Sequence, residues 1–447
     1  MYSRTRCGGE FLDLAIGRAG RKLVRFVNTR WRIAFMVSVA IAISYLDRQT
    51  LPVAIKAIER DIPMTNQQFS WLQTAFLITY ALMYAGGGQL MDVLGTRKGF
   101  TVIMVFWSLA CAGHGLAANL AMLAVFRLLL GAGEGGGFPA ATRAVTEWFP
   151  INERSTAMGI INAGTAIGMI VAPPLIALVL SFASWRWIFF ITGAFGLLWT
   201  LWWRRSYFAP EEQQVGRGVP AEPLPTPSPH LGWVELFRFR QTWGVVIAKF
   251  LSDAAWYFYL FWLPKYLYDA RGFDIKAVGT FAWIPPAGAG IGCLVGGWFS
   301  SWLLQRQLSV NRARKFALGA SAIVMPLILF VPSVPVAWAI ALFSLAYFGQ
   351  QSWSTLVMIL PTDIFPKANV GAVAGLVGFG GAMGGVVFGQ LVGYLLDRGY
   401  GWTPVFALAG SFHVVAFLII CLAIPIIRPL RELVGGPHHG GHVKERA

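Results

Sequence analysis

The sequence predicts an all-α membrane protein whose twelve transmembrane helices form two pseudo-symmetric six-helix bundles. The chain of 447 residues is 56% hydrophobic and only 13% charged, whereas soluble domains carry about 25% charged residues. Its apolar residues gather in twelve segments, each close to the roughly 20 residues that span a bilayer. A polar stretch at 205–240 divides these segments into six and six.

The twelve expected spans follow one another along the whole chain. The first six lie near 33–55, 69–91, 100–118, 120–144, 155–180 and 186–204. The other six lie near 241–268, 277–304, 315–333, 335–360, 369–396 and 402–427. The chain thus divides into a basic arm (1–32), an N-terminal bundle (33–204), a linker (205–240), a C-terminal bundle (241–427) and a tail (428–447). Alternating prolines at 223–229 favour an extended, unpacked linker.

The distribution of positive charge predicts the orientation. Twelve crossings place both termini on one side, and most of the 36 lysines and arginines fall in tails and loops of that side. Cytoplasmic loops carry such an excess, so we expect cytoplasmic termini, linker and tail in the cell's inner (plasma) membrane. Topology also explains the net charge of +16, and no nucleic-acid partner is expected. The four cysteines show no metal-ligand spacing, so no metal site is expected.

The two halves contain related motifs. Glu147-Trp148-Phe149-Pro150 is matched by Asp363-Ile364-Phe365-Pro366, 216 residues later. Three glycines follow each motif at the same distances: Gly159, Gly164 and Gly168, then Gly375, Gly380 and Gly384. Such glycines let neighbouring helices approach closely. A constant offset near half the chain length indicates an internal duplication.

Charged side chains inside the apolar segments mark the candidate site. A charge at the bilayer centre costs at least ~2.5–3.5 kcal/mol, and such residues line polar pathways. Six of them occur here: Asp47, Arg48, Arg127, Glu134, Lys249 and Asp253. Their formal charges cancel. We expect them to line a polar cavity within the membrane.

The loop after the second span reads Gly-Gln-Leu-Met-Asp-Val-Leu-Gly-Thr-Arg-Lys over 88–98. It resembles the signature of the major facilitator superfamily, whose parallel repeats form two related bundles. The resemblance implies a conformational latch made by Gly88, Asp92, Gly95, Arg97 and Lys98. An acidic residue at a helix end can pair with basic groups or with a neighbouring helix N-terminus, and Gly95 permits a tight turn.

Over nearly its whole length the chain resembles the anion:cation symporters, and within them bacterial hexuronate transporters. The matching stretches are Tyr45-x-Asp47-Arg48, Gly131 to Glu134, Phe138 to Ala141, Glu147 to Pro150, Gly159 to Thr165, Ala248 to Asp253, Phe261 to Leu267 and Gln351-x-Trp353-Ser354. One departure is Gly135-Gly136-Gly137, where the family carries a bulkier polar residue. It bears on substrate fit and on the local stability of the helix.

The resemblance assigns proton coupling to Glu134 and a second protonation site to Asp47. Arg127 lies seven residues before Glu134, on the same helix face and roughly 10 Å away along the axis. A carboxylate whose basic partner changes between conformations can load and release a proton. A static buried ion pair that holds the bundle together is the alternative.

The remaining candidates are substrate contacts. Arg48, which the resemblance assigns to the substrate carboxylate, has a planar fork that suits such a group. For the i, i+4 pair Lys249 and Asp253, an intrahelical salt bridge and a ligand contact both remain open. Hydrogen-bonding or stacking partners for a sugar would be Tyr45, Tyr80, Trp256, Tyr257, Gln350, Gln351 and Trp353.

The expected function is proton-driven import of a sugar-acid anion, most directly a hexuronate. The partners would be this carboxylate and the lipid bilayer, with protons as coupling ion, no further cofactor and a monomeric chain. A symporter or exchanger for another organic anion, such as an aldarate, aldonate or aromatic acid, is the first alternative. A membrane-embedded enzyme or sensor is the second, and the sequence offers no nucleophile–base constellation for it.

Overall fold

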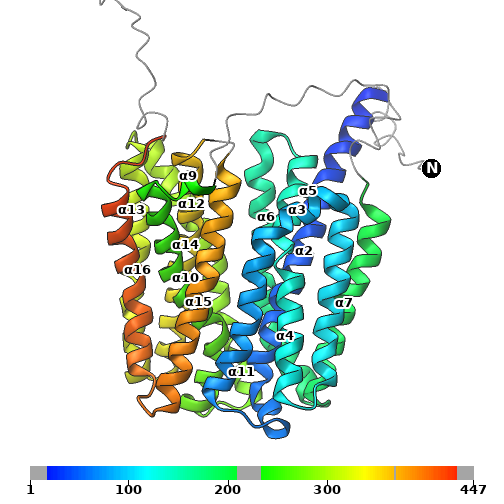
Figure 1. Ribbon diagram of the computed structural model, residues 1–447, viewed down its shortest axis with the longest axis vertical. Helices are drawn as coiled ribbons and strands as arrows, with labels where there is room; N and C mark the ends of the chain where they lie inside the picture. The colour runs from blue at the N-terminus through cyan, green and yellow to red at the C-terminus, as the bar shows by residue number, and fades with distance from the viewer. Residues whose placement is uncertain (1–17, 209–232, 367–368, 430–447) are drawn as a thin grey trace, which may run out of the picture.

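The computed structural model describes residues 18–208, 233–366 and 369–429, and all regular structure within these ranges is helical. Most of the basic arm, of the linker and of the tail therefore lies outside the described residues. Figure 1 shows the helices standing side by side in two groups, α2 to α7 in one and α9 to α16 in the other. This is the predicted all-α architecture with two bundles.

The first bundle begins with α2 (Arg18–Asp61) and α3 (Asn66–Gly113). The long α3 covers two predicted spans, and Gly95, with φ +72°, interrupts its helical course where the turn was expected. The rest of this bundle consists of a short 3-10 turn η1 (His114–Leu116), α4 (Leu120–Glu134), α5 (Gly137–Trp148), α6 (Ile151–Leu180) and α7 (Trp185–Ser206). The span predicted at 120–144 thus breaks between α4 and α5, at the glycine run.

The second bundle contains α9 (Trp233–Leu236), α10 (Arg240–Arg271), α11 (Ile275–Phe281), α12 (Ile284–Gln305), α13 (Val310–Ile323), the 3-10 helix η2 (Met325–Ser333), α14 (Val336–Ile364), α15 (Val370–Asp397) and α16 (Thr403–Ala423). Two predicted spans are broken, between α11 and α12 and between α13 and η2. Prolines follow each break directly, at Pro285 and Pro326, because proline fits the first turn of a helix but not its interior.

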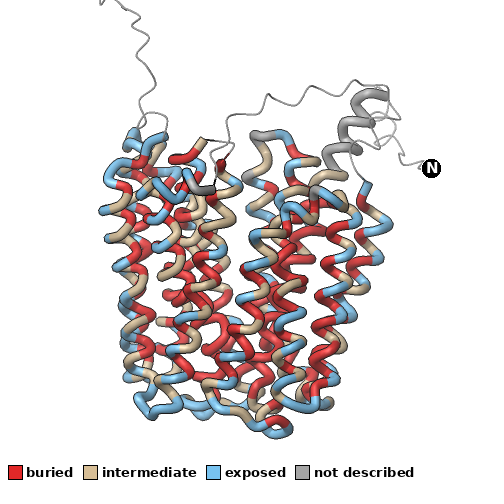
Figure 2. The backbone as a smooth tube through the Cα atoms, in the orientation of Figure 1, coloured by how far each residue is buried: buried red, intermediate tan, exposed pale blue. Residues whose placement is uncertain are grey.

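Nine segments of the described chain are long and apolar enough to cross a membrane. The predicted spans at 69–91, 186–204 and 335–360 are not among them, yet they pack in the bundles like the others (Figure 1). Buried residues run through the middle of the molecule, whereas the outward faces are largely exposed (Figure 2). Leucines there, such as Leu178, Leu198 and Leu422, are more than half exposed, as expected for a surface covered by lipid.

The repeated glycines pack equivalent helices together. A Cβ on Gly168 would lie 2.2 Å from the Ala42 carbonyl oxygen, and one on Gly384 would lie 1.9 Å from that of Phe250. Glycine therefore lets α6 lie directly on α2, and α15 on α10. Gly164 and Gly380 make the corresponding approaches to Ser38 and Val246. The duplication seen in the sequence is thus a repeated helix pair.

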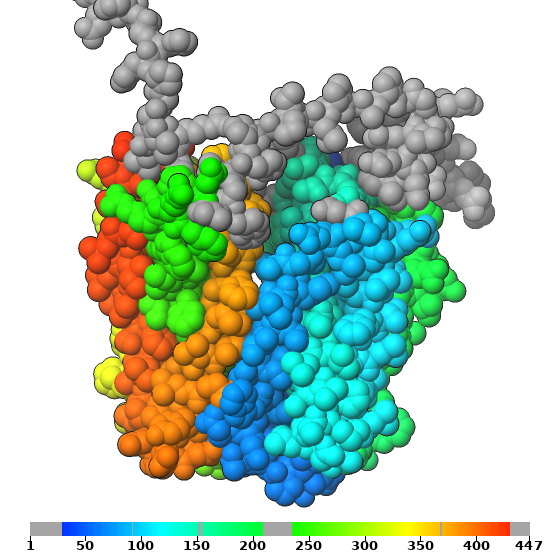
Figure 3. Space-filling model, viewed as in Figure 1, coloured from blue at the N-terminus to red at the C-terminus, as the bar shows by residue number. Residues whose placement is uncertain are grey.

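The two bundles meet mainly through α3 with α15 and through α6 with α11 and α12, and Figure 3 shows α15 (orange) directly against the lower part of α3 (blue). Polar contacts between bundles concentrate at the end where α2 passes into α3. There Lys265 Nζ binds Glu59 Oε1 at 2.8 Å, and the Asp397 carboxylate accepts from the backbone N–H of Gln67 at 2.8 Å. A pocket of about 750 Å³ opens at this end between α2, α7 and α11.

Candidate functional site

Neighbouring residues of α2 point into different environments. Asp47 and Arg48 are both 1% exposed, and adjacent helical residues diverge by about 100°. Asp47 faces Cys111 of α3 and Thr192 of α7 inside its own bundle. Its carboxyl oxygens have no hydrogen-bond partner in the described chain. Arg48 instead lies among the aromatic rings of Tyr45, Phe76 and Tyr80.

Arg48 forms a buried ion pair with Glu134. Its Nε lies 2.6 Å from Glu134 Oε2, and the Ser44 hydroxyl donates to the same oxygen at 2.7 Å. Arg127, predicted as the same-face modulator, binds Gln73 through Nη2 instead. Arg127 forms no ion pair with Glu134 in the described ranges. The direct basic partner of Glu134 therefore comes from another helix.

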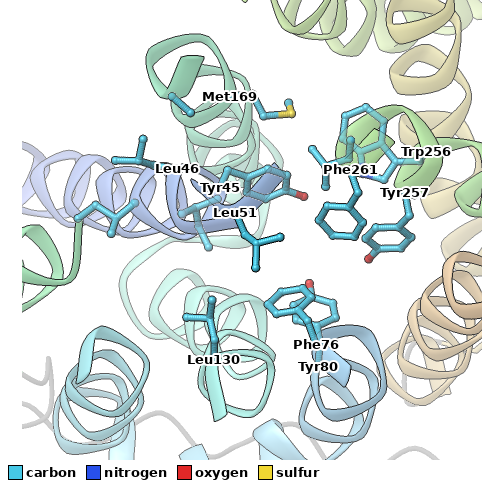
Figure 4. Packing of buried hydrophobic residues seen from close by; sticks show 14 of the residues in the cluster. Tyr45, Leu46, Leu51, Phe76, Tyr80, Leu130, Met169, Trp256, Tyr257 and Phe261 are labelled. Atoms are coloured by element: carbon cyan, nitrogen blue, oxygen red, sulfur yellow. The ribbon is translucent and has the colours of Figure 1, made fainter. Parts of the chain in front are cut away.

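The terminal nitrogens of Arg48 remain available. They donate no hydrogen bond to any described residue, while the guanidinium carbon lies 4.5 Å from the ring centres of both Tyr45 and Tyr80. Figure 4 shows the hydroxyls of Tyr45, Tyr80 and Tyr257 pointing toward one common region between the bundles. We name Tyr45, Arg48, Tyr80, Glu134 and Tyr257 the central cluster. It joins one guanidinium fork to three hydroxyls, which suits an anion that carries hydroxyl groups.

The second bundle contributes a separate polar group. Lys249 Nζ lies 3.0 Å from Asp253 Oδ1, so the intrahelical salt bridge exists. Lys249 also donates to the Ser354 hydroxyl at 2.8 Å, and Gln350 Nε2 donates to Asp253 Oδ1 at 3.3 Å. Two side chains of α14, Ser354 and Gln350, thus hydrogen-bond to the Lys249–Asp253 pair.

Pseudo-symmetry places this pair beside the central cluster. The glycine contacts match Ser38 with Val246 and Ala42 with Phe250, each 208 positions apart. In that register Asp253 occupies the place of Tyr45, and Trp256 the place of Arg48. Asp253 indeed lies within electrostatic range of the Tyr45 hydroxyl across the interface.

Glycines of α15 allow a close approach to the site. A Cβ on Gly381 would lie 2.2 Å from Asp253 Oδ2, and one on Gly385 would lie 2.4 Å from the Tyr257 ring. Gly378 likewise faces the ring of Tyr84. These three glycines lie on one face of α15, the face that contacts Tyr84, Asp253 and Tyr257.

The other predicted substrate contacts lie in different surroundings. Trp256 packs edge-on against Tyr347, with ring centres 5.4 Å apart. Trp353 is fully buried inside the second bundle, edge-on to the His413 ring. The side chain of Gln350 is buried, and that of Gln351 is partly exposed. Trp353 and Gln350 thus lie buried in the second bundle, where Gln350 contacts Asp253.

The predicted latch lies at the opposite end from the inter-bundle ion pairs. Thr96 donates to Glu147 at 2.6 Å, and Arg97 donates to the Arg204 carbonyl at 2.7 Å, so both contact their own bundle. Gly88 has open space around it, and Lys98 is exposed. The side chain of Asp92 lies outside the described residues.

Sequence reasoning missed five contributors, which are Ser44, Gln73, Tyr84, Ser354 and His413. The polar residues Ser44 and His413 each lie within an apolar segment, and this pattern could have marked them as candidates. Their partners lie on other helices, so the sequence alone did not connect them.

Known proteins resemble this chain in sequence and in fold. The sequence model of the Major Facilitator Superfamily matches residues 37–389. The chain is 31% identical over 424 residues to the hexuronate transporter of Escherichia coli K12, covering 91% of this chain and 98% of the relative. It is 33% identical over 314 residues to the galacturonate transporter of Dickeya chrysanthemi, covering 68% and 91% respectively.

Among solved structures, the fold matches a bacterial homologue of the human lysosomal transporter Spinster, in an inward-facing and unoccupied conformation. The TM-score is 0.68 at 17% identity, over 89% of this chain and 96% of that one. Both comparisons agree with the duplicated helical bundles described above. The chain belongs to the Major Facilitator Superfamily and is a multi-pass membrane transporter rather than an enzyme.

Proposed function

We propose that this protein imports a sugar-acid anion, most directly a hexuronate, together with protons. The observation that carries the proposal is the Arg48 guanidinium, which binds Glu134 through Nε and leaves its terminal nitrogens uncommitted among tyrosines. A carboxylate fits that fork, and sugar hydroxyls fit the tyrosine hydroxyls. The names of the hexuronate and galacturonate transporters among its relatives support the same substrate class.

Competition for Arg48 provides the coupling. With Glu134 ionised, the guanidinium is already neutralised, and a substrate carboxylate would bring a second negative charge into a buried site. Protonation of Glu134 removes this excess negative charge. The anion therefore binds together with a proton, and the buried site gains no net charge. Asp47 supplies a second protonation site on a different face of α2. Lys249 adds a cationic contact from the second bundle.

The proposed orientation places the termini in the cytoplasm and the chain in the inner membrane. The end closed by Lys265–Glu59 and Asp397 then faces outward. The structure corresponds in this orientation to a state closed toward the outside.

The test is transport by purified protein in liposomes, with Glu134→Gln compared with the wild type. The amide keeps size and hydrogen bonding but cannot release a proton. The variant should lose uphill accumulation of glucuronate or galacturonate under a proton gradient and retain exchange across the membrane. Ser44→Ala, which removes only the hydroxyl donor to Glu134, is the matched control and should keep accumulation. Undiminished accumulation by Glu134→Gln refutes the coupling role.

A different organic anion is the second candidate, because the Arg48 fork recognises any carboxylate. Competition by galactonate, glucarate and an aromatic acid against glucuronate distinguishes these substrates. An exchanger, unlike a symporter, would be insensitive to a protonophore.

A further inference from the structure

A chain of buried polar side chains lies behind the Lys249–Asp253 pair. His413 of α16, fully buried, contacts Gln350 Oε1 of α14 through Nε2. Gln350 Nε2 donates to Asp253 Oδ1 at 3.3 Å, and Lys249 Nζ binds the same oxygen at 3.0 Å. The chain thus links three helices and ends at the side of the central cluster.

The direction of each hydrogen bond follows from the charges. Asp253, paired with an ammonium, can only accept, so Gln350 must present its amide N–H to Asp253 and its oxygen to His413. His413 must then carry a proton on Nε2 and donate it. Nδ1 of His413 is buried and has no partner in the described chain. An added proton there would leave a buried donor unsatisfied, which costs about 1–3 kcal/mol, so the neutral Nε2–H form fits the site.

Lys249 uses two of its three N–H groups, on Asp253 and Ser354. The third remains for a ligand, and its direction depends on where Asp253 holds the ammonium. The Gln350 amide restrains Asp253, and His413 anchors the oxygen end of that amide. Without the histidine donor, Gln350 Oε1 is a buried acceptor without this partner, and the side chain can leave the position that restrains Asp253.

We propose that His413 is a positioning residue for substrate recognition, which acts through Gln350 and Asp253 to aim Lys249 at the ligand. It does not itself reach the ligand. The inference rests on the proposed transport of sugar acids, and it adds a residue of α16 to the specificity of that site.

The test compares His413→Phe, which keeps a ring against Trp353 but loses the donor, with His413→Gln, which supplies an N–H. The substrates are glucuronate, galacturonate, galactonate and glucarate, with wild-type protein in liposomes as reference. Residues of one hydrogen-bond network are coupled in energy, and His413→Phe should raise KM about 5- to 20-fold, which is about 1–1.8 kcal/mol at about 1.4 kcal/mol per tenfold. We expect a maximal rate close to wild type, and His413→Gln should restore most of the affinity. In a Lys249→Met background, His413→Phe should raise KM no further.

An unchanged KM in His413→Phe, or equal losses in the Phe and Gln variants, overturns the inference, as do effects that add to those of Lys249→Met. If the wild type moves none of the four sugar acids, the proposed function fails separately. The positioning chain is then judged by ¹⁵N NMR of histidine-labelled protein, assigned by the signal lost in His413→Phe. A neutral Nε2–H imidazole that changes on Gln350→Leu supports it. An Nδ1–H or doubly protonated ring refutes it.

Discussion

At the scale of single residues, Arg48 does two things that a different cation could not combine. Its Nε binds Glu134, and its terminal nitrogens face Tyr45 and Tyr80 without a described hydrogen-bond partner. A guanidinium presents separate edges to a protonated Glu134 and to a substrate carboxylate, whereas an ammonium is a single point charge. Protonation of Glu134 can therefore change how strongly Arg48 binds the substrate carboxylate.

Arg48→Lys should separate these two tasks. The ammonium can still neutralise Glu134 but loses the bidentate fork. Charged hydrogen bonds contribute about 1.5–3 kcal/mol, so the substrate dissociation constant should rise by about 10- to 100-fold. Binding of glucuronate or galacturonate to purified protein, followed by tryptophan fluorescence, measures the change. Wild-type affinity in this variant would remove Arg48 from carboxylate recognition.

The sequence predicted which charged residues lie in the membrane-spanning segments, but it did not predict which of them form ion pairs with one another. The divergence of Asp47 and Arg48 is a local property of a helix and was predictable. Glu134 was expected near Arg127, seven residues away, but its ion pair is with Arg48, 86 residues away. Such a pairing depends on how α2 and α4 pack, and helix spacing carries no information about that.

At the scale of helices, glycine positions decide which helices touch. The alignment of the two halves was visible in the sequence as a constant offset, because the glycines that permit close packing recur with it. The helix breaks at the glycine run and before Pro285 and Pro326 went unpredicted. Hydrophobic length alone finds a span but does not reveal interruptions within it.

Gly384→Ala should weaken the packing of α15 on α10. The new Cβ would lie 1.9 Å from a backbone oxygen of Phe250, so the helices must move apart. Overpacking of this kind costs about 1–3 kcal/mol, and we expect a lower melting temperature in detergent. Gly375→Ala, on the same helix with open space around the glycine, is the matched control. It should leave the melting temperature equal or slightly higher, because alanine favours helix. Equal losses in both variants would contradict this packing argument.

At the scale of the whole molecule, charges at one end hold the bundles together. Lys265 and Glu59 pair across the interface, as do Lys56 and Asp269 at 2.5 Å. The Lys265 side chain is only 5% exposed, so solvent screens its ion pair weakly. Opening this end must break both pairs. The network therefore favours the state closed at this end relative to the opposite state.

Glu59→Gln should shift this equilibrium toward opening. It removes the acidic partner of Lys265 across the interface and leaves Lys265 paired with Asp269 on its own helix. A loss of about 1–2 kcal/mol corresponds to a shift of roughly 5- to 30-fold in the ratio of the two states.

The reporter is Ser70→Cys in a protein without its native cysteines, since Ser70 is fully buried beneath α15. Its rate of labelling by a maleimide should rise with the open population. Arg186→Ala breaks a pair with Asp61 at the same end but within one bundle, so it should leave labelling unchanged. A faster rate in both variants would indicate general loosening, and an unchanged rate in Glu59→Gln would remove these ion pairs from control of the opening.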